Sequence, residues 1–63
     1  MKINGKETEL SYENMEELLI SNGYNIKHVA VECNGEILAK STYASYVPKS
    51  EDVIEVVTFV GGG

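Results

Sequence analysis

Residues 53–60 read VIEVVTFV and run directly into three glycines at positions 61–63. The stretch is dense in β-branched residues, which predicts a β-strand. Glu55 is expected to point to solvent, so the two-residue alternation of a strand assigns its neighbours to opposite faces. The inward-facing residues are expected to be Ile54, Val56, Thr58 and Val60. The same alternation leaves Val53, Val57 and Phe59 on the exposed side with Glu55.

An apolar pair, Val57 and Phe59, is thereby predicted to lie exposed next to the end of the strand. An exposed apolar patch rimmed by acids is typical of a protein-binding surface, so both residues are candidates for a partner surface. The alternative is that the loop at residues 40–50, with Tyr43 and Tyr46, folds over them.

Gly61, Gly62 and Gly63 form a separate segment after a domain that is predicted to span residues 1–60. Glycine has no side chain and adopts almost any φ, so we expect a thin and flexible tail. Three residues reach roughly 10 Å beyond the sheet. Such a tail can thread a narrow channel and present a terminal carboxylate to another protein's active site. The alternative is a frayed end without a role.

Upstream of this strand, Asn-Gly pairs at residues 4–5 and 34–35 predict two tight hairpin turns. The second turn is expected to join a strand over residues 27–33 to a short strand over 36–38. The inward side of the longer strand is predicted to carry Val29, Val31 and Cys33.

Residues 12–22 predict one helix, with Ser11 as its N-cap and Gly23 as its stop. The apolar stripe along this helix consists of Met15, Leu18 and Leu19. Two hairpins, one helix and a late strand indicate an α+β fold, in which a mixed sheet packs on one main helix.

Arrangements of residues that could perform catalysis are missing from the sequence. His28 and Cys33 are expected on opposite faces of one strand, which disfavours a nucleophile–base pair, and they are too few to hold zinc. The adjacent acids at 16–17 and 51–52 are interpreted as a solvated face, or as an acidic surface that meets a basic partner. We therefore expect no catalytic residue and no metal site, and a protein that is not an enzyme.

The charge of the chain indicates which classes of partner are not expected. The 63 residues carry a formal charge of -5, and none of the five basic residues is arginine. Nucleic acid and anionic membranes are therefore not expected as partners. A single cysteine cannot form an internal disulfide, no apolar run approaches a membrane span, and the N-terminal MKINGKE lacks the apolar core of a signal peptide. These features favour the cytoplasm.

The whole chain resembles the ThiS family, the ubiquitin-like sulfur carriers of thiamine biosynthesis. The resemblance rests on INGKE at residues 3–7, VAVECNGEIL at 29–38 and, most specifically, DVIEVVTFVGGG at 52–63. It implies a β-grasp fold. Glu51 and Lys40 depart from the family pattern, where glycine and arginine are common at these two positions.

The resemblance also implies a mechanism in which the chain binds no cofactor of its own. A ThiF-like adenylyltransferase uses ATP and magnesium to adenylate the terminal glycine, here Gly63, and a sulfur donor converts the adenylate to a thiocarboxylate. Thiazole synthase then takes the sulfur. Gly61 and Gly62 would line the access channel, and Val57 and Phe59 would join the docking surface. Two alternatives remain open, a β-grasp sulfur carrier of another pathway, such as molybdopterin synthesis, and a ubiquitin-like interaction module whose tail never reacts.

Overall fold

The structure is a computed structural model that describes residues 1–9 and 11–59. Val60, Gly61, Gly62 and Gly63 lie outside the described residues, so the expectations placed on them are not addressed by the fold. The elements, in chain order, are β1 (Lys2–Ile3), β2 (Lys6–Glu7), α1 (Met15–Ser21), the 3-10 turn η1 (Ile26–His28), β3 (Val29–Cys33), β4 (Glu36–Leu38), the 3-10 turn η2 (Lys40–Thr42) and β5 (Val53–Thr58).

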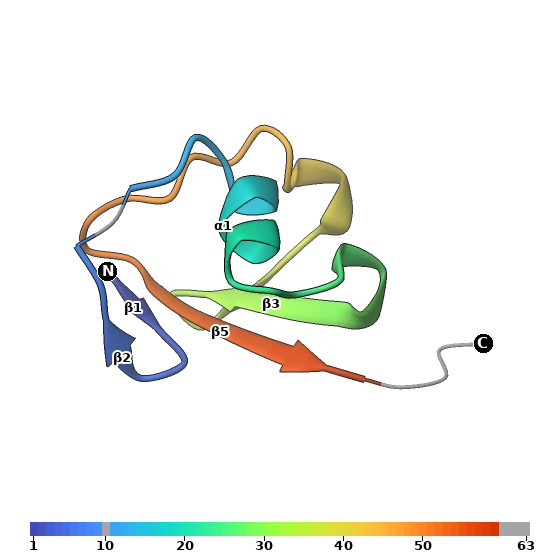
Figure 1. The fold of residues 1–63 in the computed structure, drawn as a ribbon, viewed down its shortest axis with the longest axis horizontal. Helices are drawn as coiled ribbons and strands as arrows, with labels where there is room; N and C mark the ends of the chain where they lie inside the picture. The colour runs from blue at the N-terminus through green and yellow to red at the C-terminus, as the bar shows by residue number, and fades with distance from the viewer. Residues whose placement is uncertain (10, 60–63) are drawn as a thin grey trace.

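The described strands form one five-stranded sheet in the order β2-β1-β5-β3-β4. β1 runs parallel to β5, whereas the other neighbouring pairs are antiparallel. Figure 1 shows α1 lying across one face of this sheet, in which β5 is the central strand. The predicted α+β architecture, a mixed sheet packed on one helix as in the β-grasp fold, is confirmed.

Both predicted Asn-Gly hairpins are present. The φ angles are 51° at Asn4 and 82° at Gly5, and 55° at Asn34 and 85° at Gly35. Two successive positive φ angles define the tight turn that suits the twist of a two-stranded hairpin, and asparagine and glycine tolerate them best. Local sequence therefore sets the outer hairpins of the sheet.

The helix begins later than the sequence predicts. Its N-cap is Asn14, not Ser11, because the Asn14 side chain accepts a 2.8 Å hydrogen bond from the Glu17 backbone N–H. The Glu17 carboxylate in turn accepts a 2.7 Å bond from the N–H of Glu13. These two bonds satisfy donors at the start of the helix, and they place its first turn at Met15. The predicted stop is correct, since Gly23 follows the helix with a φ of 84°.

The core lies between α1 and the inner face of the sheet. As predicted, the helix stripe, the inward residues of β3, and Ile54 and Val56 of β5 are buried. Thr58 is exposed, although its position in the alternation faces inward. β3 begins at Val29 rather than residue 27, because η1 takes up the preceding residues. Tyr43, from the irregular segment after β4, is buried in the same core.

Asp52 corrects one sequence interpretation, because it is buried with only 2% of its surface exposed, while Glu51 beside it is exposed. Its carboxylate accepts hydrogen bonds from the Tyr46 hydroxyl at 2.6 Å, the Asn34 amide at 2.9 Å and the Lys49 backbone N–H at 2.9 Å. The Asn34 side chain also accepts a 2.9 Å bond from Val53 N–H, at the start of β5. The network therefore ties the β3–β4 turn to the strand that leads to the tail.

Stability is expected to depend on the ionisation of Asp52. Burial raises the pKa of Asp52, but the hydrogen bonds from Tyr46 and Asn34 outweigh burial and hold this pKa below its usual value. The ionised carboxylate therefore stabilises the fold above the unfolded-state pKa of about 3.9, and this contribution is lost as the pH falls through the lower folded-state pKa. Urea unfolding midpoints measured from pH 7 downward should fall more steeply for the native chain than for Asp52→Asn. Equal slopes would contradict the assignment.

Candidate functional site

The sheet has one face that the helix does not cover. We call it the outer face and define it by the side chains of Ala30, Glu32, Ile37, Glu55, Val57 and Phe59. Three of these are large and exposed hydrophobics, with exposed fractions of 76% for Ile37, 61% for Val57 and 42% for Phe59. Scattered exposed aliphatics are ordinary on protein surfaces, but adjacent ones on one sheet face indicate an interaction surface.

The predicted exposure of Val57 and Phe59 is confirmed, and the alternative that the loop at residues 40–50 folds over them with Tyr43 and Tyr46 is wrong. Tyr43 instead packs into the core, and Tyr46 bonds to Asp52. Phe59 is held in place by a 2.9 Å hydrogen bond from its backbone N–H to the carbonyl of His28. The ammonium group of Lys40 lies 5.6 Å from the centre of its ring.

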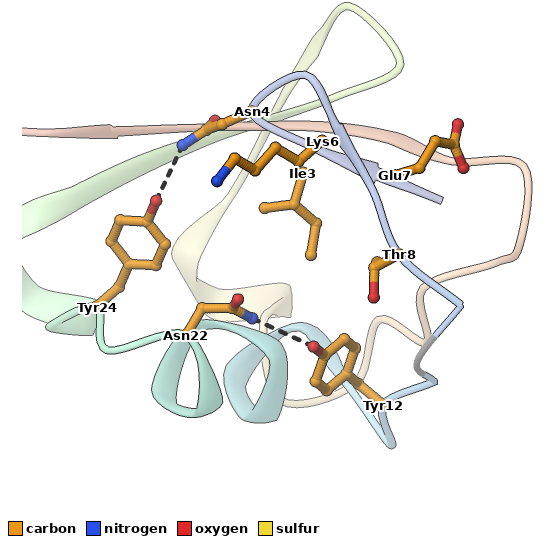
Figure 2. Close-up of a pocket in the computed structure, with 8 residues that line it drawn as sticks. All are labelled: Ile3, Asn4, Lys6, Glu7, Thr8, Tyr12, Asn22 and Tyr24. Carbon is orange, nitrogen blue, oxygen red and sulfur yellow. Dashed lines mark hydrogen bonds between the residues drawn. The ribbon is translucent and has the colours of Figure 1, made fainter.

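A side chain from the first hairpin supports the end of β5 that leads to the tail. Asn4 Oδ1 accepts a 2.7 Å bond from Val56 N–H, and Asn4 Nδ2 donates to the carbonyl of Val56 at 3.3 Å. The amide thus continues the pairing of β1 with β5 beyond the end of β1. Asn4 Nδ2 also donates to the Tyr24 hydroxyl at 2.9 Å, as Figure 2 shows. Hydrogen bonds therefore hold the end of β5 on both sides, from Asn4 on one side and from His28 on the other.

Figure 2 also shows a polar pocket between the first hairpin and the end of α1. Its amide and hydroxyl groups bond to one another, since Asn22 Nδ2 donates to the Tyr12 hydroxyl at 3.3 Å and Asn4 donates to Tyr24. These bonds join the hairpin and the helix to the segments beside them. The pocket is accordingly interpreted as part of the scaffold.

The residues considered for catalysis or metal binding do not form a reactive group. Within the described part of the chain, no three His, Cys, Asp or Glu residues are placed to hold a metal ion. Cys33 is buried, its thiol donates to the Tyr46 hydroxyl at 3.3 Å, and burial raises the pKa of this thiol, which disfavours the reactive thiolate. His28 is exposed in η1, outside β3.

Comparison with known proteins shows to which family this chain belongs. The sequence pattern of the ThiS family matches residues 1–63, which is the full length of the chain. The chain belongs to the ThiS family. The sulfur carrier protein ThiS of Bacillus subtilis is 38% identical over 65 residues, which cover 100% of this chain and 98% of that protein.

Two further relatives of this ThiS-family chain are thiazole synthases. The protein of Paramagnetospirillum magneticum is 44% identical over 62 residues, and that of Magnetococcus marinus is 43% identical over 49 residues. The matches cover 97% and 78% of this chain but span only 19% and 15% of the length of those relatives.

The fold agrees with solved ThiS structures. The crystal structure of the thiamine biosynthesis protein ThiS from Geobacter metallireducens superposes with a TM-score of 0.77 at 35% identity, covering 98% of this chain and 96% of that one. A solution structure of a Geobacter metallireducens thiamine biosynthesis protein gives 0.74 at 32% identity. The second match covers 98% of this chain and 85% of that one. None of the helices in the described portion is long and apolar enough to cross a bilayer.

Sequence reasoning placed Val57, Phe59 and Glu55 on this face but did not identify Ile37 or the approach of Lys40. Ile37 lies in a strand too short to show a clear alternation, and Lys40 reaches Phe59 only through the path of the loop after β4. Alternation places Glu55 on the exposed side of its strand, and it places Glu32 on the side opposite Val31 and Cys33. Their position directly opposite one another depends on the register of β3 with β5, which the sequence alone does not reveal.

Proposed function

We propose that this chain is a sulfur carrier for thiazole formation in thiamine biosynthesis. The reactive group is the carboxylate of Gly63. A ThiF-like adenylyltransferase adenylates it with ATP and magnesium, so that one carboxylate oxygen bonds to the α-phosphorus and pyrophosphate leaves. A sulfur donor then attacks the carbonyl carbon, AMP departs, and a thiocarboxylate remains. Thiazole synthase receives this sulfur.

One observation carries the proposal: a ThiS-family chain in which a firmly held strand runs toward a glycine tail beside an exposed apolar surface. β5 is paired with β1 and β3, so its direction is fixed by both neighbours. Val57 and Phe59 give a partner something to recognise close to the reacting end. In this proposal the carrier supplies the carboxylate of Gly63 and a docking surface.

The chemistry itself falls to the partner enzymes. A carboxylate is a poor electrophile, and its activation with ATP needs bound magnesium and cationic groups around the phosphates. The described residues provide neither a metal-binding group nor an arginine. The proposal therefore assigns adenylation and sulfur transfer to the partner enzymes.

The thiazole synthase relatives support the choice of pathway. Each of those two thiazole synthases contains a segment that is similar to this chain. A carrier-like segment joined to a thiazole synthase is consistent with sulfur delivery to thiazole. A molybdopterin carrier has no comparable support among these relatives.

The intact mass of the protein tests the proposal. The chain ending at Gly63 is incubated with ATP, magnesium, sulfide and the adenylyltransferase from the same genome. We expect a mass increase equal to the replacement of one oxygen by sulfur, absent when ATP is left out. An adenylyltransferase that activates a known carrier but leaves this chain unchanged would favour the unreactive interaction module.

A charge placed in the apolar pair is expected to weaken docking. Val57→Asp puts a carboxylate where we expect an apolar contact, and it should weaken binding to the adenylyltransferase about tenfold or more. Ile20→Asp is the matched control, because Ile20 on α1 is 60% exposed and Val57 is 61% exposed. Calorimetric titration should give a native-like Kd for the control. Equal losses in both variants would show that the outer face is not the docking surface.

A further inference from the structure

Glu32 and Glu55 lie directly opposite one another on β3 and β5 in the antiparallel register. Both side chains belong to the outer face and are exposed. The β-carbons of such cross-strand partners are about 4.5–5.5 Å apart, and like charges in this position destabilise the sheet. The fold therefore retains a repulsive pair at the centre of its open face.

No basic group among the described residues forms an ion pair with Glu32 or Glu55. Within residues 1–9 and 11–59, the only ion pair joins the Met1 amine to Glu7. Lys40, which reaches the same face, lies over the Phe59 ring and donates to the carbonyl of Lys27 at 3.2 Å. Two carboxylates thus face solvent together without an ion-pair partner among the described residues, and Lys2, which lies opposite Val53 on β1, pairs with neither of them.

The same carboxylates border a shallow apolar hollow. Its other lining residues include Ala30, Ile37 and Val57. Ile37 is the cross-strand partner of Glu32, and Val57 is the partner of Ala30. Because Ala30 is small, the larger side chains of Ile37 and Val57 rise on either side of it. The hollow therefore combines aliphatic walls with two adjacent negative charges.

We propose that this hollow receives an arginine side chain of the partner protein, whose guanidinium binds Glu32 and Glu55 together. An arginine stem packs on aliphatic surface while its charged head stays near polar groups. The planar guanidinium has five donors and can bond two carboxylates at once, which a lysine ammonium does less well. The net charge of -5 favours a basic partner surface as well. The inference rests on the proposed function, since it specifies the partner of the same docking face.

Binding to the adenylyltransferase gives the first test. Glu32→Gln and Glu55→Gln are each expected to weaken binding, which raises the Kd about tenfold at low salt. The double variant should weaken it by less than the product of the two, because both carboxylates bind one group. Glu16→Gln, an exposed acid on α1, changes the net charge equally and should leave Kd near the native value. Equal effects from Glu16 and the pair would overturn the inference.

The stability of the free chain gives a second readout. Removing one of two repelling charges is expected to raise Tm by a few degrees, while binding becomes weaker. A structural role for the pair predicts the opposite, a fall in Tm that accompanies the loss of binding. A lower Tm in Glu32→Gln and Glu55→Gln would therefore count against the proposal.

A third measurement separates this inference from the proposed function. N-acetyl-arginine amide is titrated into the labelled free chain, and backbone amide shifts are followed by NMR. We expect shifts at Ala30, Glu32 and Val57 that are smaller with N-acetyl-lysine amide and absent in the double variant. Shifts elsewhere, or shifts that persist in the double variant, overturn the arginine site even if the enzyme binds. Shifts in the hollow without enzyme binding or thiocarboxylation mean that the proposed function fails while the arginine site stands.

Discussion

A chain that ends at Gly62 is expected to form no thiocarboxylate, while its thermal unfolding midpoint stays within about one degree of the full chain's. Removing Gly63 moves the terminal carboxylate back by roughly 3.3–3.6 Å. A misplacement of about 1 Å at a reacting centre can already reduce a rate about 100-fold. The buried core lies between Met15 and Val56, well before the deletion, so stability should not change.

The intact mass after incubation with the adenylyltransferase, ATP, magnesium and sulfide shows whether the thiocarboxylate forms. Calorimetry measures the thermal unfolding midpoint. Gly63→Ala is the matched control, because it keeps the length of the chain and adds only a methyl group. We expect it to retain part of the reaction, which separates reach from the need for a thin tail. A truncated chain that is converted as fully as the native one would rule out Gly63 as the reacting residue.

Asp52→Ala is expected to have a large effect on folding for a single side-chain change. It leaves the Tyr46 hydroxyl, the Asn34 amide and the Lys49 N–H without their acceptor in a partly buried place. Each unsatisfied buried group costs about 1–3 kcal/mol, and we expect a total loss of about 3–4 kcal/mol because water reaches some of them. A domain of this size has a free energy of unfolding of about 3–9 kcal/mol, so much of it would be lost.

Glu51→Ala is the control, since Glu51 is the adjacent acid, is exposed, and accepts only a 3.2 Å bond from the Ser50 hydroxyl. Its change in unfolding free energy should stay within about 0.5 kcal/mol. Urea titration followed by circular dichroism measures both. If the two variants lose similar amounts, the Asp52 network does not hold β5 to the β3–β4 turn.

Much of the fold was predictable because its signals are local. Each Asn-Gly pair specifies its turn through the positive φ angles that the turn needs, and period-two alternation assigned Ile54 and Val56 to the core. The exposure of Val57 and Phe59 followed from the same alternation. These predictions needed no knowledge of where distant segments meet.

The features that the sequence did not predict correctly depend on tertiary contacts. Asn14 replaced Ser11 as the N-cap because the helix start also depends on Met15 reaching the core, where its backbone N–H bonds to the Tyr46 carbonyl. Asp52 was interpreted as solvated because the sequence does not show that Asn34, 18 residues away, and the turn that carries Tyr46 and Lys49 direct their donors at it. The Glu32–Glu55 pair likewise depends on a strand register set by long-range pairing. Tertiary contacts decided each of these features.

The strand order β2-β1-β5-β3-β4 also has a kinetic consequence. The two hairpins are local and can form within about 1–10 μs, but neither includes the central strand. The sheet closes only when β5 pairs with β1 and β3, and its pairing with β1 joins segments about fifty residues apart. Such long-range pairing is slow compared with local structure. The outer face is divided in the same way, because β5 contributes Glu55 and Val57 while β3 contributes Glu32. An enzyme that recognises both halves therefore engages only carriers that have finished folding.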